Sequence, residues 1–324
     1  MRRSVLKKPG LSRRRSGSGF RYLDPAGTPV RDRETLDRIK SLAIPPAWTD
    51  VWICPDPRGH IQATGIDAAG RKQYRYHDAW RTARDEQKFD RVREVAGRLP
   101  KIRDRLCSDL TGRGLTRERV LAAIVRLLDL GMFRVGGDAS ASRDEDPSYG
   151  LSTLRPEHVL RRGGEMMLKF RGKSGVEHER VVDDGEVAEV LGALKRRRRG
   201  EDRLFAYWNS SVRAWQEIRA DAVNEYLREI SGAPMTAKDF RTWHGTVTAA
   251  AELAEAGPQP TRTKRRKVVA QAMREVADKL GNTPAVARAS YVDPRLLDKY
   301  EKGEAPKRGD EREVRRLLDD SAAS

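Results

Sequence analysis

The sequence predicts an α+β protein in two parts: a small β-rich N-terminal domain and a mainly α-helical domain that carries a small antiparallel sheet. Short runs bounded by turn residues dominate residues 20–85, whereas apolar residues at three- and four-residue steps dominate residues 86–324. Strand-like runs return once, in residues 151–182. At 324 residues the chain is long enough for two such domains.

The composition indicates a polyanionic partner. Lys and Arg number 65 against 48 Asp and Glu, which gives a formal net charge of +17, and such an excess is typical of nucleic-acid-binding proteins. No apolar run approaches the roughly 18 residues of a membrane span, and the basic N-terminus lacks the apolar segment of a secretory signal. We therefore expect a soluble cytoplasmic protein in which Cys54 and Cys107 are reduced thiols.

Neither metal-binding nor nucleotide-binding motifs stand out. The five histidines are scattered and form no ligand spacing with the two cysteines. The chain also has no GxxxxGK[ST] loop for ATP. We therefore expect no metal site and no cofactor.

The N-terminal domain is expected to follow a basic tail. Residues 1–19 are rich in Arg, Lys, Gly and Ser and offer almost nothing to bury, which predicts a flexible segment. Order is expected to begin at Phe20. A helix is expected over residues 33–42, and strands over residues 20–23, 51–54, 60–64 and 71–77.

The last of these strands carries a candidate DNA-binding face. Amides can read base edges, aromatic rings can stack, and cations can hold phosphates. The strand mixes all three types in Arg71, Lys72, Gln73, Tyr74 and Tyr76. An ordinary edge strand with a solvated, charged face explains the pattern equally well.

The central part of the chain offers two cationic candidates. Residues 116–130 predict a helix with Gly131 as its C-cap, and Arg134 follows between apolar neighbours. Lys173 is expected at the tip of a hairpin. The strands expected in this part are residues 151–154, 158–160, 166–170 and 176–182.

Helices return in the C-terminal third. An apolar stripe from Trp215 to Tyr226 predicts one helix. A capping-box sequence from Thr236 to Asp239 predicts the start of the next, which places Arg241 one turn inside it.

Residues 264–294 predict three successive helices. Gly281 ends the first, Thr283 and Pro284 begin a short second one, and a third begins at Asp293 and Pro294. This places Asn282 at a helix junction and Tyr291 near the end of the short helix. Tyr291 is a candidate nucleophile, although the local pattern also fits a core tyrosine, and Asn282 also fits a helix cap.

These candidates resemble, in type and order, the catalytic set of the type IB DNA topoisomerases, in particular their small bacterial and poxvirus-like branch. The matching strings extend over most of residues 20–300: GRKQYRYH, GMFRVGG, YGLSTLRPEHV, FRGKSGVEH, KDFRTWHGT and LGNTPAVARASYV. The resemblance implies that Tyr291 is the nucleophile, that Arg134 and Arg241 bind phosphate, and that Lys173 is the general acid. Many members have a histidine where this chain has Asn282.

The resemblance also implies a fold and a function. The fold would be the catalytic fold shared by topoisomerases IB and tyrosine recombinases. The protein would relax supercoiled duplex DNA through a transient 3′-phosphotyrosyl link, without ATP or metal, as a monomer of the bacterial nucleoid. Residues 20–85 would form half of a clamp, with Gln73, Tyr74 and Tyr76 facing the major groove.

Two alternatives remain at this point. A tyrosine site-specific recombinase shares the catalytic fold, but recombinases typically carry a helical N-terminal domain, whereas residues 20–85 predict strands. A catalytically silent DNA-binding protein is the other alternative, and the complete five-residue set argues against it.

Overall fold

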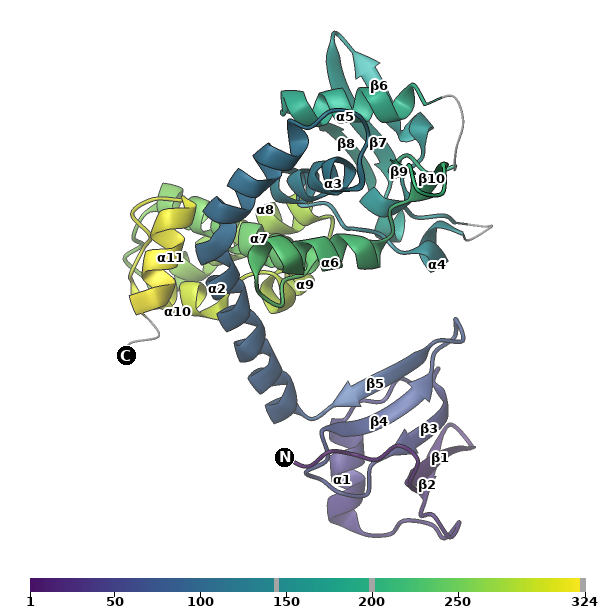
Figure 1. Ribbon diagram of the computed structural model, residues 1–324. Helices are drawn as coiled ribbons and strands as arrows, with labels where there is room; N and C mark the ends of the chain where they lie inside the picture. The colour runs from purple at the N-terminus through teal and green to yellow at the C-terminus, as the bar shows by residue number, and fades with distance from the viewer. Residues whose placement is uncertain (143–145, 198–201, 321–324) are drawn as a thin grey trace. The chain divides into compact units, whose positions relative to one another are not determined.

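The computed structural model describes residues 1–142, 146–197 and 202–320. The chain divides into two compact units, Met1–Lys88 and Phe89–Ser324 (Figure 1), where the sequence places the boundary between residues 85 and 86. The division falls inside one long helix, α2 (Asp78–Leu110).

The first unit is a five-stranded antiparallel sheet with one short helix. The strand order is β2-β1-β3-β4-β5, so β5 lies at an edge. Ile39 of the helix packs on the apolar face of the sheet, and the strands and helix expected between residues 20 and 77 are confirmed. The elements are β1 (Leu11–Ser16), β2 (Gly19–Leu23), α1 (Arg33–Ser41), β3 (Thr49–Ile53), β4 (Ile61–Ile66) and β5 (Lys72–Tyr76).

The predicted flexible tail over residues 1–19 is wrong, because this segment contributes β1 to the sheet. Leu11 is 8% exposed and belongs to the core of the unit. The Arg13 guanidinium donates to three carbonyl oxygens of residues 44–48 and lies 4.1 Å from the centroid of the Phe20 ring. Composition alone treats such an arginine as solvated, whereas here its hydrogen bonds hold the segment in place.

The second unit is mainly helical and carries two small antiparallel sheets, which confirms the expected α+β class. Beyond α2, its helices within the described residues are α3 (Arg117–Gly131), α4 (Asp138–Ala141), α5 (Gly185–Lys195), α6 (Ala220–Ser231), α7 (Ala237–Ala256), α8 (Arg262–Leu280), α9 (Pro284–Ser290), α10 (Pro294–Lys302) and α11 (Glu311–Asp320). The three-stranded sheet is β6 (Val159–Arg162), β7 (Glu165–Arg171) and β8 (Glu177–Val181), and the two-stranded sheet is β9 (Ala206–Asn209) and β10 (Ala214–Glu217).

Helix α3 forms the centre of this unit. Val120, Leu121, Ile124 and Leu128 are fully buried, because α5, α6, α7 and β9 all pack against the helix. Each such side chain contributes roughly 1.5–3 kcal/mol of burial free energy. Helix α7 also packs along α8, so the ends of α3 and α8 both lie within reach of Arg241 on α7.

Two local predictions in this unit are wrong. Residues 151–154 form a 3-10 turn, Leu151–Thr153, in place of a strand. Trp215 belongs to β10, opposite Trp208 of β9, and the helix begins only at Ala220. The apolar residues from Trp215 onward have the three- and four-residue spacing of a helix, which explains the wrong prediction. The pairing of Trp215 with Trp208 is a contact between two strands, and this spacing carries no information about it.

Candidate active site

Four segments of the second unit carry the predicted catalytic residues. Arg134 lies in the turn after α3, and Lys173 lies at the tip of the β7–β8 hairpin. Arg241 lies in α7, whereas Asn282 and Tyr291 lie at the two ends of α9.

Arg241 joins the ends of two helices. The predicted capping box is present, since the Thr236 N–H donates to the Asp239 carboxylate at 2.8 Å, and it fixes the start of α7 one turn before Arg241. The side chain of Arg241 is 3% exposed. Its Nη1 donates to the carbonyl oxygen of Met132, and its Nη2 donates to the carbonyl oxygen of Leu280 at 2.7 Å.

The end of α3 differs from the prediction that Gly131 is its C-cap. Met132 takes the left-handed conformation, at φ 53° and ψ 25°, which costs a non-glycine residue about 1 kcal/mol. Gly131 is required for space, because a Cβ there would lie 2.1 Å from the ring of Phe133. The strained residue is also the one whose carbonyl accepts from Arg241.

Asn282 uses its backbone to cap α8 and its side chain to contact Arg134. Gly281 takes the left-handed conformation, as expected, and its N–H donates to the carbonyl of Asp278 at 3.3 Å. The Asn282 N–H donates to the carbonyl of Ala277 at 2.9 Å, which completes a Schellman cap. The Asn282 Oδ1 accepts from Arg134 Nη2 at 2.8 Å, so the side chain is not the cap.

Arg134, Arg241 and Asn282 form a polar cluster, and two buried donors of this cluster have no hydrogen-bond partner among the described residues. They are the Nε of Arg241 and the Nδ2 of Asn282. Buried polar groups in folded proteins are nearly always paired, so exceptions call for a ligand, a water or a functional reason.

Tyr291 ends α9 beside this cluster. Thr283 and Pro284 begin the short helix as predicted, and the Tyr291 side chain is 6% exposed. The guanidinium carbon of Arg241 lies 5.2 Å from the centroid of the Tyr291 ring. Helix α7 approaches closely here, since a Cβ on Gly245 would lie 2.7 Å from the Tyr291 carbonyl oxygen.

The electrostatics of the cluster favour negative charge. Burial alone would raise the pKa of Tyr291, but the charges of Arg241 and Arg134 outweigh it and the pKa lies below the ordinary tyrosine value. Burial, together with the charge of Arg134, lowers the pKa of Arg241 to about 10. Within the described part of the chain neither arginine forms an ion pair with a carboxylate.

Lys173 is exposed and lies in a 3-10 turn, Lys173–Gly175, in which Ser174 has φ 64°. Its amine forms no hydrogen bond or ion pair with any described residue. The hairpin below it packs against the α8–α9 junction, because a Cβ on Gly281 would lie 3.3 Å from Val176 and 3.6 Å from His178. The structure therefore brings the hairpin and the Asn282 junction together.

Sequence reasoning missed two residues of this region, Gly245 and His178. Both lie inside the strings that carry the family resemblance, KDFRTWHGT and FRGKSGVEH. Neither could be identified from one sequence, because the importance of each comes from close packing against residues far away in the chain.

The predicted DNA-binding strand has one exposed face. Lys72, Tyr74 and Tyr76 point to the same side of β5 because side chains alternate along a strand. Each of the two tyrosines is 40% exposed, and their rings stack with centroids 6.1 Å apart.

Arg71 and Gln73 are held differently from those three residues. Both contact the Asp67 carboxylate, Arg71 through its Nη2 at 2.8 Å and Gln73 through its Nε2 at 2.8 Å. These hydrogen bonds, that of Arg71 first, lower the pKa of Asp67 to about 2.

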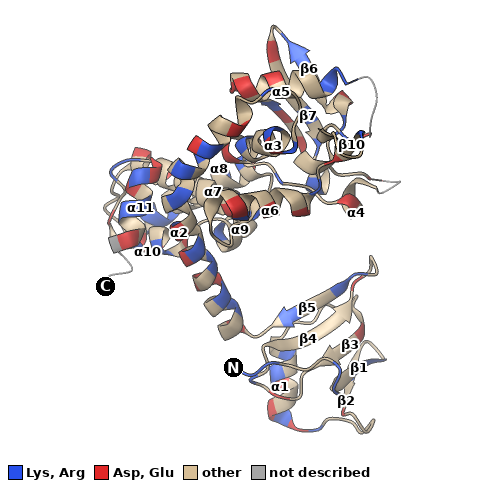
Figure 2. Ribbon diagram, viewed as in Figure 1, with Lys and Arg blue, Asp and Glu red and all other residues tan. Residues whose placement is uncertain are grey.

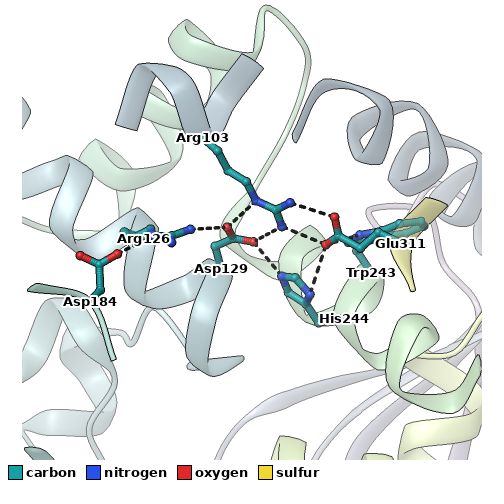
Figure 3. A network of polar contacts seen from close by, with 7 residues as sticks. All are labelled: Arg103, Arg126, Asp129, Asp184, Trp243, His244 and Glu311. Atoms are coloured by element: carbon teal, nitrogen blue, oxygen red, sulfur yellow. Dashed lines mark hydrogen bonds and ion pairs between the residues drawn. The ribbon is translucent and has the colours of Figure 1, made fainter. Parts of the chain in front are cut away.

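A second polar cluster, which we call the Asp129 network, connects α3 and α7, the helices next to Arg134 and Arg241, with other helices of the unit. Figure 3 shows it as a chain of ion pairs and hydrogen bonds. Its members are Arg103, Arg126, Asp129, Asp184, Trp243, His244 and Glu311.

The Asp129 network is densely paired. Arg103 donates to Asp129 from Nε at 2.8 Å and to Glu311 from Nη1 at 2.8 Å. Asp129 also contacts His244 Nε2 at 2.9 Å, and Glu311 accepts from Trp243 Nε1 at 3.1 Å. These contacts connect helices α2, α3, α7 and α11. On α7 they are made by Trp243 and His244, which lie two and three positions after Arg241.

Lys and Arg recur on elements of both units (Figure 2). Among the described residues, no three His, Cys, Asp or Glu side chains gather as metal ligands would. In the same part of the chain, no helix has both the length and the apolar character that crossing a bilayer requires.

Comparison with known proteins identifies the family. Residues 77–316 match the catalytic core of eukaryotic DNA topoisomerase I, and residues 19–67 match the N-terminal domain of bacterial DNA topoisomerase IB. The chain is 30% identical to DNA topoisomerase 1B of Acanthamoeba polyphaga mimivirus over 90% of its own length and 88% of the relative. It is 24% identical to DNA topoisomerase 1B of vaccinia virus (strain Copenhagen) over 86% of its length and 84% of that protein.

The chain therefore belongs to the type IB DNA topoisomerases, which are isomerases that act on DNA. The resemblance indicated by the six strings is confirmed. The match of residues 19–67 to a topoisomerase domain decides against the recombinase alternative.

Proposed function

We propose that Tyr291 cleaves one strand of duplex DNA by attack of its phenolic oxygen on a backbone phosphorus. A bond forms between the phenolic oxygen and phosphorus while the bond from phosphorus to O5′ breaks. The phenol proton leaves to water, and the Lys173 ammonium gives a proton to the departing O5′. The strand with the free 5′-hydroxyl then rotates. In the reverse reaction O5′ attacks the phosphorus, the bond from phosphorus to the Tyr291 oxygen breaks, and the DNA strand is resealed.

Arg134, Arg241 and Asn282 bind the non-bridging oxygens of the phosphate. The observation that carries this assignment is a pair of buried donors with no partner among the described residues, Arg241 Nε and Asn282 Nδ2. The Arg241 guanidinium also lies against the Tyr291 ring. A phosphodiester supplies the missing acceptors as well as the negative charge that two unpaired arginines favour. Asn282 contributes a donor without charge, in the role that a histidine has in many members.

Lys173 suits the role of general acid because of where it lies. Its amine is exposed at a hairpin tip and engages no described residue, so it is available to a bound DNA strand. The hairpin contacts the α8–α9 junction, which carries Asn282.

The first unit binds the DNA as the second half of a clamp, through Lys72, Tyr74 and Tyr76 of β5. Support comes from the exposure of this face and from its mixture of a cation and stacked phenols. Gln73 and Arg71 contribute less, since both already bind Asp67. Replacement of Tyr74 and Tyr76 by alanine should weaken DNA binding without changing the cleavage rate of bound DNA, whereas unchanged affinity would remove this face from the interface.

One chain suffices for this reaction, and neither ATP nor a metal takes part, so we assign a monomer. The match to a bacterial N-terminal domain supports a place in the bacterial nucleoid. The test is relaxation of supercoiled plasmid in EDTA without nucleotide. Wild type and Tyr300→Phe should relax the plasmid, because the Tyr300 hydroxyl only donates to the Gly257 carbonyl at 2.8 Å. Tyr291→Phe should bind DNA but neither relax nor link to it, and relaxation by this variant would refute the mechanism.

A further inference from the structure

His178 has no role in the chemistry above, yet its ring packs against residues that neighbour the proposed catalytic residues in the chain. It is the cross-strand partner of Phe170 in the β7–β8 hairpin, and the two rings stack with centroids 4.9 Å apart and planes at 29°. The ring of Phe133 meets it edge-on, at 6.2 Å and 67°. Phe133 directly precedes Arg134.

The other edge of the imidazole packs against backbone. A Cβ on Gly172 would lie 2.6 Å from both Nε2 and Cδ2 of His178, and a Cβ on Gly281 would lie 3.6 Å from its Cε1. Gly172 directly precedes Lys173, and Gly281 directly precedes Asn282. One ring therefore contacts the chain neighbours of three proposed catalytic residues.

The ring fills this place without adding charge. Burial, with the charges of Arg180, Arg241 and Arg134, lowers the pKa of His178 to about 4, so the imidazole is neutral at neutral pH. Within the described residues it forms no hydrogen bond. Shape and neutrality, more than hydrogen bonding, define what this position requires.

We propose that His178 is a positioning residue that holds the Lys173 hairpin against the α8–α9 junction. The inference rests on the proposed role of Lys173 as general acid. Because the Lys173 amine engages no described residue, the hairpin alone decides where the amine lies relative to O5′. A displacement of about 1 Å in such a group can cost on the order of 10²-fold in rate.

The test compares single-turnover cleavage of two DNA substrates, one with the natural 5′ oxygen and one with a 5′-bridging sulfur that leaves without a proton. His178→Ala should cleave the oxygen substrate at least about tenfold more slowly than wild type, and the sulfur substrate should restore most of the rate. His178→Phe keeps a neutral ring and should remain within about threefold of wild type on both substrates.

His158→Ala is the matched control. The His158 ring also faces Phe170, with centroids 6.4 Å apart, and it contacts Tyr149 at 4.5 Å. Its loss should lower the melting temperature much as His178→Ala does, while the ratio of the two cleavage rates stays at the wild-type value.

Lys173→Ala separates failure of the inference from failure of the proposed function. If the sulfur substrate does not rescue Lys173→Ala, the general-acid assignment fails and the inference falls with it. If Lys173→Ala is rescued but His178→Ala is equally slow, or equally fast, on both substrates, the positioning role is overturned and the proposed function stands. A tenfold loss in His178→Phe on the oxygen substrate would also overturn it, because the ring is retained.

Discussion

Helix α3 with the turn that follows it, and helix α7, each contribute to two polar clusters that differ in how well their charges are paired. In the Asp129 network, Arg103 donates from Nε and from both Nη nitrogens to the carboxylates of Asp129 and Glu311. In the active site, Arg134 and Arg241 lie together with no carboxylate partner among the described residues. We infer that the paired cluster stabilises the fold, and we propose that the unpaired one binds an anion that the protein does not itself supply.

The difference has an energetic meaning. Uncompensated buried charges and unsatisfied donors cost stability, and local rules of this kind are broken mainly where function requires it. Substitutions in the active-site cluster should therefore change catalysis, and those in the Asp129 network should change stability.

The largest contrast is expected between Arg241→Gln and Arg103→Gln. The first removes a cation that faces the charge of the transition state, so single-turnover cleavage should fall by about 10³-fold. The second breaks the partly buried ion pairs of Arg103 with Asp129 and Glu311 and should lower the unfolding free energy by about 3 kcal/mol, with cleavage within about threefold of wild type. Cleavage assays and chemical denaturation measure the two effects, and loss of the same property in both variants would end the distinction between the clusters.

Asn282→Ala should slow cleavage by about 10²-fold, as expected for a lost donor to a developing charge. The melting temperature should change little, because Gly281 and the Asn282 backbone cap α8 without the side chain. The control is Asn224→Ala, since Asn224 Oδ1 accepts from the Ala237 N–H at 3.0 Å at the start of α7. That variant should lose about 1 kcal/mol of stability and keep the cleavage rate; a reversed pattern would make Asn282 a structural residue.

Gly245→Ala should slow cleavage by about tenfold, because the added methyl group meets the Tyr291 carbonyl oxygen and shifts the nucleophile. Gly185→Ala is the matched control, as a Cβ on this glycine of α5 meets nothing within 4 Å. It should leave both rate and stability nearly unchanged. Equal rates for the two variants would show that the close approach of α7 does not set the position of Tyr291.

The smallest effect concerns pH. Burial would raise the pKa of Asp129, but hydrogen bonds from Arg103 and His244 outweigh it and hold the pKa below its usual range. A carboxylate with a lowered folded-state pKa contributes its full stability above its unfolded pKa, about 4, and loses it as pH falls further. Between pH 5 and pH 3, wild type should therefore lose stability more steeply than Asp129→Asn, by up to about 1.4 kcal/mol per pH unit. Parallel stability curves from chemical denaturation would contradict this.

The sequence predicts features that depend on neighbours along the chain. Gly281, Thr283 and Pro284 set the helix ends around Asn282 by their own backbone preferences, and the Thr236 capping box sets the start of α7. The proposed catalytic residues were identified through the family resemblance, because Tyr291 considered alone also fits a core position.

The features that the sequence does not predict depend on contacts between distant residues. Arg103 and Glu311 are 208 positions apart, and neither shows its partner in the local pattern. Gly131 is an apparent C-cap whose actual constraint is the ring of Phe133. Arg13 belongs to a segment that composition marks as flexible, but it is fixed by carbonyl groups more than 30 positions away.

The most direct test of the account is to locate the covalent link. A DNA substrate that traps the cleaved state should be incubated with the protein in EDTA. The attached DNA should then be trimmed by nuclease and the protein digested with trypsin. Cleavage after Arg288 and Arg295 releases a peptide that contains Tyr291 but not Tyr300. A nucleotide phosphate is expected on the Tyr291 peptide; a link on any other peptide, or no link from an enzyme that relaxes DNA, would contradict the proposed mechanism.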